Sequence, residues 1–426
     1  MGLNMETVLV CTVGGSHEPI VTAIESLSPD RVCFVCSRDD GATGAKGSYL
    51  QITGKGNVLT ARRQDDKPSL PNIPTLIGLS EDRFEVLLVA PDDFDDARQR
   101  IAEWLATQHG EALRLVADYT GGTKTMSAAL VCAALDDGRV ALQLVTGARA
   151  DLTRVESGSQ QALPARVFGT RFRRDLDRAL SMWKNHAYEQ AVLLLEDITP
   201  PMEGMQSSIY QRARDLSRAF TLWDRFDHQG AYAVLSRYRP VVGRRWAPLL
   251  RVLDLLVKEV PAREPLRLFD LFRNAERRAA QGRYDDAVAR LYRMLEWSAQ
   301  WLLRERAGID TSDVPETCIP PGLVLPENRR GRRQAGLHAA WQLAAAHAGE
   351  TVARFWALHQ AQVLDLLTRR NHSILAHGFT PLTEADWRSF YDWTHDHLVP
   401  LLLESSGGEP YRVRTLPDQL PTRMPE

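Results

Sequence analysis

The stretch VLVCTVGGSHEPIVTAIESLSPDRVCFVCS, residues 8–37, decides the fold of the N-terminal half of this chain. It contains two short apolar runs, Val8–Val13 and Arg31–Ser37, separated by a Gly-Gly turn and an amphipathic segment over Pro19–Leu27. Continuous apolar runs of this length are typical of strands that are covered on both faces. A helix between two such strands allows them to pair in parallel. This stretch therefore predicts a strand–helix–strand unit of a parallel sheet.

The same alternation continues to about residue 146. We expect three further strands, over Phe84–Ala90, Leu113–Asp118 and Val140–Thr146. We expect two further helices, over Asp92–Gln108 and Lys124–Leu135. The Gly-, Ser-, Asp- and Pro-rich segment 38–79 interrupts the pattern and is expected to be a long insertion with one short helix or hairpin. The predicted fold class is an α/β Rossmann-like parallel-sheet domain with helices on both faces.

Strand patterns end near residue 166, and the remainder of the chain is predicted to be an all-α helical region. We expect an α/β domain over 1–165, a helical middle region over 166–262, a second helical domain over 263–406 and a loose tail over 407–426. A helical-repeat scaffold is an alternative, because three segments resemble one another weakly. These segments have unequal spacing and are Ala179–Leu195, Ala219–Leu235 and Ala275–Leu295.

Bulk composition narrows the class of function. The chain has 426 residues, of which 44% are hydrophobic and 25% charged, as in ordinary globular proteins. A formal net charge of −2 excludes a global basic field, so double-stranded DNA is not an expected partner and any polyanion site must be local. No run approaches 18 apolar residues and the N-terminus lacks a signal-peptide pattern, so no membrane association is expected.

The five cysteines favour a reducing compartment and argue against a metal site. Their odd number and mostly apolar surroundings predict free, buried thiols in a cytoplasmic protein. Cys33 and Cys36 form a C-x-x-C pair, but two strand residues three apart point to opposite faces. No second pair of ligands follows. We therefore expect no metal ion and no cofactor.

Two Gly-Gly loops lie where strands of the predicted sheet end, after Val13 and after Asp118. Each contains hydroxyl residues and precedes a helix, so backbone amides, a helix N-terminus and Lys124 together form a candidate anion cradle. The candidate ligand-binding residues are Thr12, Gly14, Gly15, Ser16, Thr120, Gly121, Gly122, Thr123 and Lys124. The spacing matches neither a P-loop nor a dinucleotide fingerprint. Two ordinary strand-to-helix turns are the alternative interpretation.

The segment RNHSILAHG, residues 370–378, is the strongest candidate for catalysis. If the preceding helix continues through it and ends at Gly378, Arg370 and His377 lie within about 20° of one face and about 10 Å apart along the axis. A histidine transfers protons near neutral pH, an arginine stabilises a phosphorane, and Asn371 can orient either group. These residues suit metal-free cleavage of RNA through attack by a 2′-hydroxyl. A polar helix end capped by a histidine is the alternative.

Glu296 is a weaker candidate. It follows an apolar stripe on the helix that is expected to face the catalytic segment, so it could pair with Arg370. A place on a solvated helix face is the stronger expectation.

At these residues the chain resembles a known class of protein. The Arg370–His377 spacing on a late helix resembles the R-x₄₋₆-H signature of HEPN ribonucleases, and helices over Phe269–Ala280 and Tyr284–Arg304 resemble the opening hairpin of that domain. The two Gly-Gly loops resemble those of CARF domains, the Rossmann-like sensors of type III CRISPR systems. The resemblance covers Val8–Arg149 and Leu266–Leu403, and the middle region carries no such likeness.

The resemblance implies a CRISPR-associated CARF–HEPN ribonuclease of type III antiviral defence. It implies a cytoplasmic homodimer that binds one cyclic oligoadenylate, with the tetra-adenylate ring favoured, between its two CARF domains. Ligand binding then activates a composite site in which Arg370 and His377 of both chains cleave single-stranded RNA. Two alternatives stay open: a non-catalytic nucleotide-sensing regulator with a helical protein-docking domain, and a ring nuclease that acts only in the N-terminal domain.

Overall fold

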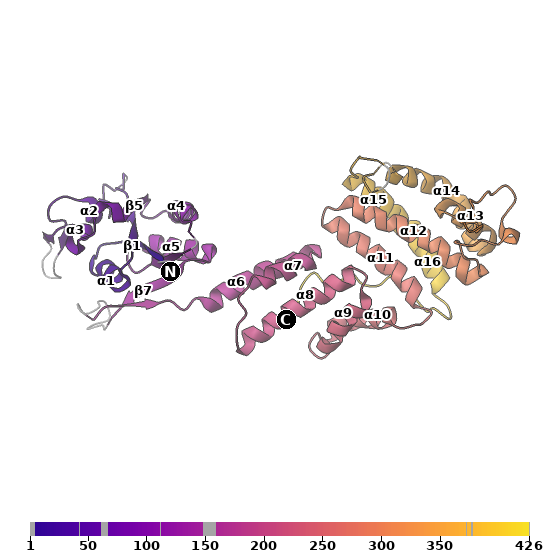
Figure 1. Ribbon diagram of the computed structural model, residues 1–426, viewed down its shortest axis with the longest axis horizontal. Helices are drawn as coiled ribbons and strands as arrows, with labels where there is room; N and C mark the ends of the chain where they lie inside the picture. Colours follow the sequence, from indigo (N-terminus) through magenta and orange to yellow (C-terminus); the bar gives the residue numbers. More distant parts are fainter. Residues whose placement is uncertain are drawn as a thin grey trace. The chain divides into compact units, whose positions relative to one another are not determined.

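The computed structural model describes residues 5–41, 43–60, 67–110, 112–147, 159–371, 373–375 and 378–425 (Figure 1). The chain forms two compact units, Met1–Arg173 and Arg174–Glu426. The first is built around a sheet, and the described part of the second consists of helices and the segments that join them.

The first unit contains a six-stranded sheet with the strand order β5–β2–β1–β6–β7–β8. Its strands are β1 (Glu6–Val13), β2 (Arg31–Ser37), β5 (Phe84–Val89), β6 (Leu113–Asp118), β7 (Ala141–Thr146) and β8 (Gln161–Pro164). The strands from β5 to β7 in this order pair in parallel, which confirms the predicted fold class. β8 pairs antiparallel with β7 at the sheet edge and is absent from the sequence-based prediction.

Helices cover both faces of this sheet. Two of them pack on one face with Val10 and Cys33, and the third packs on the other face with Leu9 and Cys36. The helices on the first face are α4 (Phe94–Thr107) and α5 (Lys124–Asp137), and the helix on the second is α1 (Glu18–Leu27). The two cysteines therefore point to opposite faces as predicted, and burial raises the pKa of the Cys36 thiol to about 12. The C-x-x-C pair is part of the core.

The insertion after β2 contains more structure than its composition predicts. Its elements are α2 (Leu50–Thr53), β3 (Leu59–Thr60), β4 (Pro68–Leu70), α3 (Ile73–Ile77) and a 3-10 turn (Glu81–Arg83). β3 and β4 form an antiparallel hairpin. Ile52, Leu59 and Ile73 are buried in the apolar cluster that contains α1. The insertion therefore extends the core on that face of the sheet.

The middle region of the chain consists of paired helices. They are α6 (Phe168–Ser181), α7 (Tyr188–Glu196), α8 (Gly204–Asp224), α9 (His228–Leu235) and α10 (Ala247–Val257), with 3-10 turns at Met182–Asn185, Ser236–Tyr238 and Arg244–Trp246. The aromatic rings of Trp183, Tyr188, Phe220 and Trp246 are buried and contact one another. These rings hold the helix pairs of the region together.

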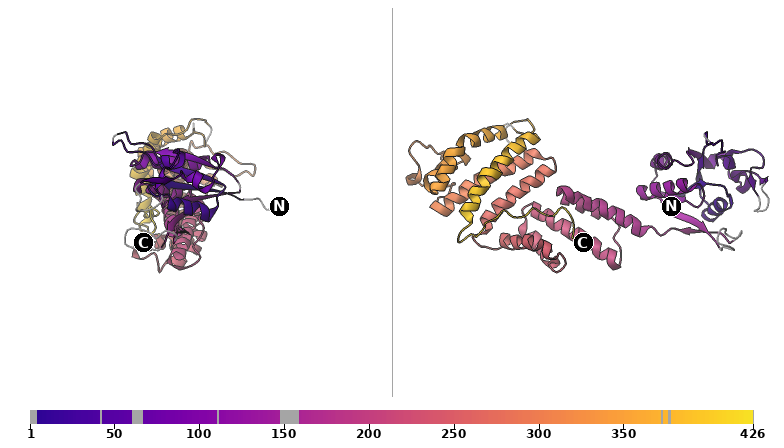
Figure 2. Two further views of the ribbon diagram at one scale, coloured as in Figure 1. Left: turned by 90° about the vertical axis from the view of Figure 1, so that its left-hand side faces the viewer. Right: turned by 180° about the vertical axis from the view of Figure 1, so that it is seen from behind.

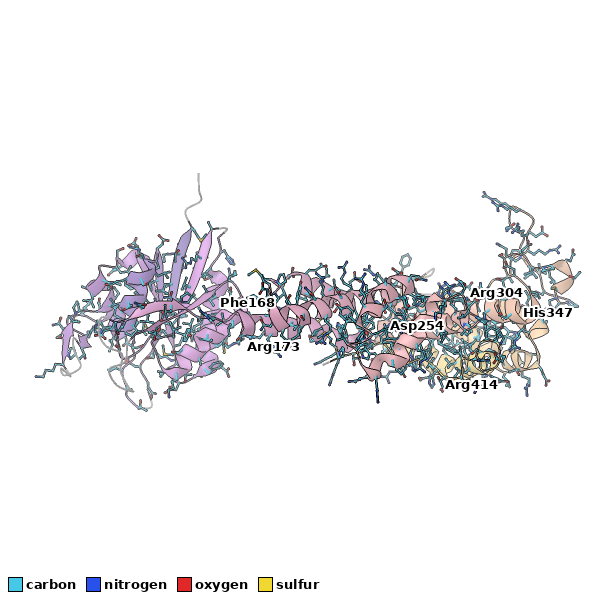
Figure 3. All side chains as sticks on the ribbon, turned by 90° about the horizontal axis from the view of Figure 1, so that it is seen from below. Phe168, Arg173, Asp254, Arg304, His347 and Arg414 are labelled. Atoms are coloured by element: carbon cyan, nitrogen blue, oxygen red, sulfur yellow. The ribbon has the colours of Figure 1, made fainter. Side chains whose placement is uncertain are left out.

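The C-terminal helices form a bundle around two long helices. They are α11 (Arg263–Ala280), α12 (Tyr284–Ala307), α13 (Leu337–His347), α14 (Glu350–Asn371), α15 (Glu384–Trp393) and α16 (Val399–Ser406), with a 3-10 turn at Glu316–Cys318 and a π-helical turn at Thr394–Leu398. α11 and α12 lie side by side (Figures 1 and 2). Arg304 of α12, labelled in Figure 3, pairs with Glu264 of α11. One hydrophobic cluster extends from Trp183 to Leu420, so the middle and C-terminal regions share a core.

The last residues of the chain do not form the loose tail that their composition predicts. Val413 is buried in the helical core. Arg273 donates from Nε to the carbonyl of Pro417 at 2.8 Å, and the Tyr188 hydroxyl donates to the carbonyl of Pro421 at 2.8 Å. These partners are 144 and 233 positions apart in sequence, so local composition could not reveal them. Residues 407–425, which we call the strap, therefore contact both helical regions and join them.

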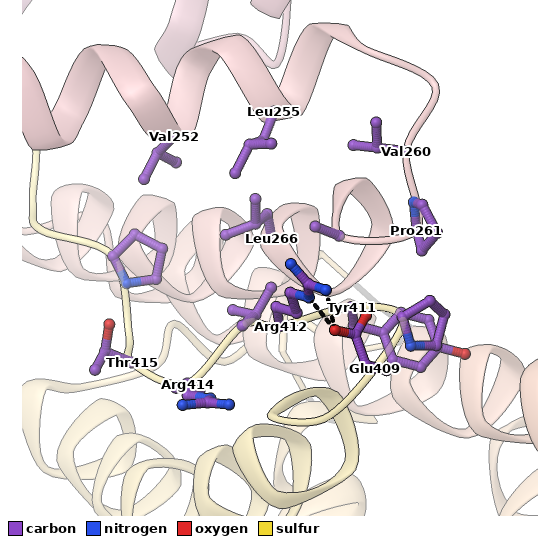
Figure 4. Close-up of a pocket in the computed structure, with 14 residues that line it drawn as sticks. Val252, Leu255, Val260, Pro261, Leu266, Glu409, Tyr411, Arg412, Arg414 and Thr415 are labelled. Carbon is purple, nitrogen blue, oxygen red and sulfur yellow. Dashed lines mark hydrogen bonds and ion pairs between the residues drawn. The ribbon is translucent and has the colours of Figure 1, made fainter.

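A cavity of about 530 Å³ lies between this strap and helices α10 and α11 (Figure 4). Val252 and Leu255 of α10, Leu266 of α11 and Tyr411 and Val413 of the strap give it mostly apolar walls. The strap therefore bridges α10 and α11 without filling the space between them.

Within the ranges described above, no helix combines the length and the apolar content that crossing a bilayer requires. The same ranges contain no cluster of three or more His, Cys, Asp or Glu side chains arranged to hold a metal ion.

Candidate functional site

The two Gly-Gly loops meet at one edge of the sheet because β1 and β6 are parallel neighbours. Cys11 of β1 lies opposite Asp118 of β6 in the register of this pair. Both strands therefore end at the same edge, and in open parallel sheets ligands bind beyond these carboxyl ends. The structure brings together the two loops that the sequence pattern singled out.

The loops touch through their backbones, and glycines make this approach possible. A Cβ added to Gly14 would lie 2.5 Å from the amide nitrogen of Gly122. A Cβ added to Gly121 would lie 2.2 Å from the carbonyl oxygen of Thr12. Gly122 also has a φ of +82°, a conformation that favours glycine. Larger residues at these positions would push the two loops apart.

The threonines of the loops build the cradle. Thr12 has no exposed surface, and its hydroxyl donates to the carbonyl of Gly121 at 2.6 Å. Thr120 accepts at Oγ1 from the amide of Val145 at 2.6 Å. Thr123 caps the N-terminus of α5 with its side chain. These hydroxyls are therefore engaged within the protein, and the predicted ligand contact of Thr12 is replaced by a supporting role.

Gly15, Ser16 and Lys124 are the predicted cradle residues that the structure leaves exposed. Lys124 is the first residue of α5, so its ammonium group and the helix N-terminus contribute positive potential at the same place. A Cβ added to Gly15 would have no neighbour within 4 Å, so the space beside this loop is open. An anionic group would be held best here.

Two residues that sequence analysis missed support the cradle. Asp118 is only 2% exposed and accepts from the amide of Thr120 at 3.0 Å and from Nε2 of Gln143 at 3.2 Å. Burial raises the pKa of this carboxyl, and the hydrogen bonds from Thr120 act in the opposite direction. Gln51 of the insertion donates from Nε2 to the carbonyl of Gly14. The sequence could have identified Asp118, because it is an acidic residue at the end of an apolar strand. Nothing in the sequence around Gln51 indicates its contact with Gly14.

The helix that carries Arg370 ends earlier than predicted. α14 stops at Asn371 instead of continuing to Gly378. The amide of Ser373 donates to the carbonyl of Arg370 at 2.9 Å, which closes the last turn. His377 lies outside the described residues. The prediction that it shares a helix face with Arg370 required the helix to continue to Gly378, so that prediction no longer holds.

Two tertiary contacts follow the early helix end. The amide of Leu382 donates to Oδ2 of Asp285, in the first turn of α12, at 3.1 Å. Ser373 also forms a short bridge with Thr380. These contacts accompany the helix end in the structure.

Arg370 lies in the last turn of α14 with its guanidinium against an aromatic ring. Its Cζ is 4.2 Å from the centroid of the Tyr292 ring on α12. Its Nη1 donates to Oδ1 of Asn371 at 3.4 Å, and its Nε is buried without a hydrogen-bond partner. The alternative pair with Glu296 is not formed, because Glu296 pairs with Arg293 at 2.6 Å. Arg370 is thus held by its flat face against the Tyr292 ring.

Two family models match the helical part of the chain. The model described as the Csm6 6H domain matches residues 173–256, and the model described as the Csm6 HEPN domain matches residues 258–398. Together they cover more than half of the 426 residues. No curated protein matches the chain.

Csm6 and Can2 are two of the proteins with solved structures to which this chain is similar. Enterococcus italicus Csm6, bound to cyclic hexa-2′-fluoro-hexa-dAMP, is 14% identical over 94% of both chains, with a TM-score of 0.49. Can2 of Sulfobacillus thermosulfidooxidans, in complex with cyclic tetra-adenylate, is 11% identical over 56% of this chain and 69% of that chain, with a TM-score of 0.24. At these values the assignment rests on the two family models.

A parallel α/β domain followed by 6H and HEPN domains defines the class of CRISPR-associated CARF–HEPN ancillary effectors. Both matched models describe one family, so the chain belongs to the Csm6 family. The middle region, which carried no likeness in its sequence pattern, is the 6H domain of that family. A helical-repeat scaffold is no longer needed to explain it.

Proposed function

We propose that this protein is an endoribonuclease of type III CRISPR defence that a cyclic oligoadenylate activates. The observation that carries the proposal is the setting of Arg370. It lies inside the segment that the HEPN model matches, in the last turn of α14, with its guanidinium face against the Tyr292 ring. The spacing from Arg370 to His377 fits the R-x₄₋₆-H pattern of HEPN ribonucleases.

The proposed chemistry needs only side chains. His377 takes the proton of a 2′-hydroxyl, which attacks the adjacent phosphorus, and a protonated imidazole returns a proton to the leaving 5′-oxygen. Arg370 stabilises the negative charge of the phosphorane, and the exposed Asn371 orients the phosphate. Single-stranded RNA is the proposed substrate, because its backbone is free to align for this attack. Two HEPN domains of a homodimer are proposed to form one composite site.

We propose that the cradle binds a cyclic oligoadenylate, and we favour the tetra-adenylate ring. Its phosphates suit the exposed surface of Gly15, Ser16 and Lys124 and the N-terminus of α5. A ring with repeated phosphates can occupy two such cradles related by the two-fold axis of a dimer.

The direct test uses labelled single-stranded RNA and the purified protein in excess EDTA, with cyclic tri-, tetra- or hexa-adenylate added separately. We expect cleavage that depends on the tetra-adenylate ring, persists in EDTA and leaves a 2′,3′-cyclic phosphate. Absence of cleavage with every ring would favour the non-catalytic regulator. Consumption of a ring without RNA products would favour the ring nuclease.

Replacing Lys124 with methionine is expected to raise the tetra-adenylate concentration for half-maximal RNA cleavage by about 10-fold or more. A hydrogen bond from a charged group contributes about 1.5–3 kcal/mol, and every 1.4 kcal/mol is about tenfold in affinity. The rate at saturating ligand should stay the same, because the nuclease residues are intact. Lys258→Met, at an exposed lysine of the helical unit, is the matched control. Equal half-maximal concentrations in the two variants would remove Lys124 from the proposed ligand site.

A further inference from the structure

We propose that Tyr292 is a positioning residue for Arg370, which it holds by a cation–π contact on the guanidinium face so that the Nη edge can meet the scissile phosphate. This inference rests on the proposed ribonuclease function. Neither the R-x₄₋₆-H pattern nor the spacing of apolar residues singles out Tyr292.

The contact joins two helices that carry different parts of the HEPN segment. Tyr292 is half-buried on α12, and Arg370 is half-buried at the end of α14. The guanidinium carbon lies 4.2 Å from the ring centroid, well inside the range of about 6 Å in which the quadrupole of an aromatic ring attracts a cation. An aromatic ring at this distance restricts the rotamers that the long arginine side chain can adopt.

The kind of partner determines what Arg370 can do. A carboxylate would engage the guanidinium edge with two hydrogen bonds and neutralise its charge. The Tyr292 ring contacts the face and accepts no N–H bond in the plane, so the edge remains available. Nε of Arg370 is buried and has no hydrogen-bond partner, which is a costly state for a charged donor. Because Nε is buried, a phosphate oxygen would meet the guanidinium at its Nη atoms.

The same face of α12 also holds the far end of the catalytic segment. Asp285 precedes Tyr292 by seven residues, so the two side chains lie within about 20° of one another around the helix. Asp285 accepts the amide of Leu382 at 3.1 Å, while Tyr292 contacts Arg370. The segment 370–382 is therefore fixed to α12 at both ends. This arrangement supports a positioning role for Tyr292, because Arg370 and Leu382 are both held against α12.

The ring, and not the hydroxyl, is the active part of Tyr292 in this proposal. Within the described part of the chain the Tyr292 hydroxyl has no hydrogen-bond partner, so phenylalanine should replace tyrosine without loss. Leucine and methionine fill comparable space without an aromatic face. Two substitutions without a ring, Tyr292→Leu and Tyr292→Met, separate the loss of the contact from a local packing defect.

The experiment compares kcat and KM for RNA cleavage at saturating tetra-adenylate in the full-length protein. We expect kcat to fall about 10-fold or more in Tyr292→Leu and Tyr292→Met, with unchanged tetra-adenylate dependence, and to stay within about twofold in Tyr292→Phe. Tyr232→Leu is the matched control, because the Tyr232 ring lies 5.9 Å from the guanidinium of Arg239 on the 6H domain. It should cleave RNA at the unaltered rate.

The outcomes distinguish failure of the proposed Tyr292 role from failure of the proposed nuclease function. Normal kcat in Tyr292→Leu, or an equal loss in Tyr292→Phe, would overturn the cation–π role and leave the nuclease function standing. If the unaltered protein cleaves no RNA, the nuclease function fails and the contact is judged by NMR. The Nε–H resonance of Arg370, assigned through its absence in Arg370→Lys, should then shift in Tyr292→Leu and stay in place in Tyr292→Phe. An unshifted resonance would overturn the contact as well.

Discussion

RNA cleavage by the His377→Ala variant is expected to be at least about 100-fold slower than cleavage by the unaltered protein at saturating cyclic oligoadenylate. Positioned proton transfer contributes about 10²–10⁴-fold to such reactions, and alanine removes the group that performs it. Arg370 cannot substitute, because a guanidinium does not give up its proton in proteins. The measurement is single-turnover cleavage of labelled RNA, together with calorimetric titration of the ligand, whose affinity should not change.

His395→Ala is the matched control for this loss. His395 is exposed, pairs with Asp396 at 2.8 Å and belongs to the same HEPN segment, but it lies on the π-helical turn after α15. It should cleave RNA at the unaltered rate when it is purified by the same procedure, which also accounts for contaminating ribonucleases. Equal cleavage by the two variants would refute the role of His377 and favour the non-catalytic regulator.

The central strands of the sheet could be predicted because each one is a recognisable apolar run in the sequence. β2 and β6 have the predicted bounds, Arg31–Ser37 and Leu113–Asp118, since strands buried on both faces are continuous apolar runs. β8 over Gln161–Pro164 has no buried residue and contains a proline. Only its pairing with β7 makes it a strand, and pairing partners are not encoded in local composition.

The candidate site was predictable only where local chemistry determines it. Gly-Gly turns at the ends of parallel strands identify the cradle, but the inward orientation of Thr12 depends on Gly121, which is 109 positions away. The prediction continued the preceding helix to Gly378, whereas the helix ends at Asn371 and leaves the side chains of Ile374 and Leu375 exposed. The orientation of Thr12 thus depends on a long-range contact that local composition does not encode.

A buried ionic cluster between the 6H and HEPN domains gave no signal in the sequence. Arg277 of α11 has no exposed surface, and its Nε lies 2.7 Å from Oδ1 of Asp224 in α8. It also donates to Oε1 of Gln419 in the strap at 2.8 Å and lies 3.5 Å from Oδ1 of Asp270. His228 of α9 lies 2.8 Å from the other oxygen of Asp270. Arg277 thus joins the two domains and the strap.

Replacing Arg277 with methionine is expected to lower the free energy of unfolding of the helical unit by about 3–5 kcal/mol. Removal of one partner from a buried ion pair leaves the other charges, here those of Asp224 and Asp270, with less compensation, although Arg278 still pairs with Asp224 and His228 with Asp270. Methionine keeps much of the side-chain volume, so the packing contribution is small. Tryptophan fluorescence during urea unfolding measures the change, because all ten tryptophans except Trp104 lie in this unit.

Arg304→Met is the control, because the pair of Arg304 with Glu264 also joins two helices but is partly exposed, and such pairs contribute little to stability. Adding Asp270→Asn to Arg277→Met should recover part of the loss, since it removes a stranded charge and the amide oxygen can still accept from the indole of Trp223. A defect in packing alone would not be recovered in this way. Equal urea midpoints for the Arg277 and Arg304 variants would mean that the cluster contributes no net stability. The strap and the shared apolar core would then be what joins the 6H domain to the HEPN domain.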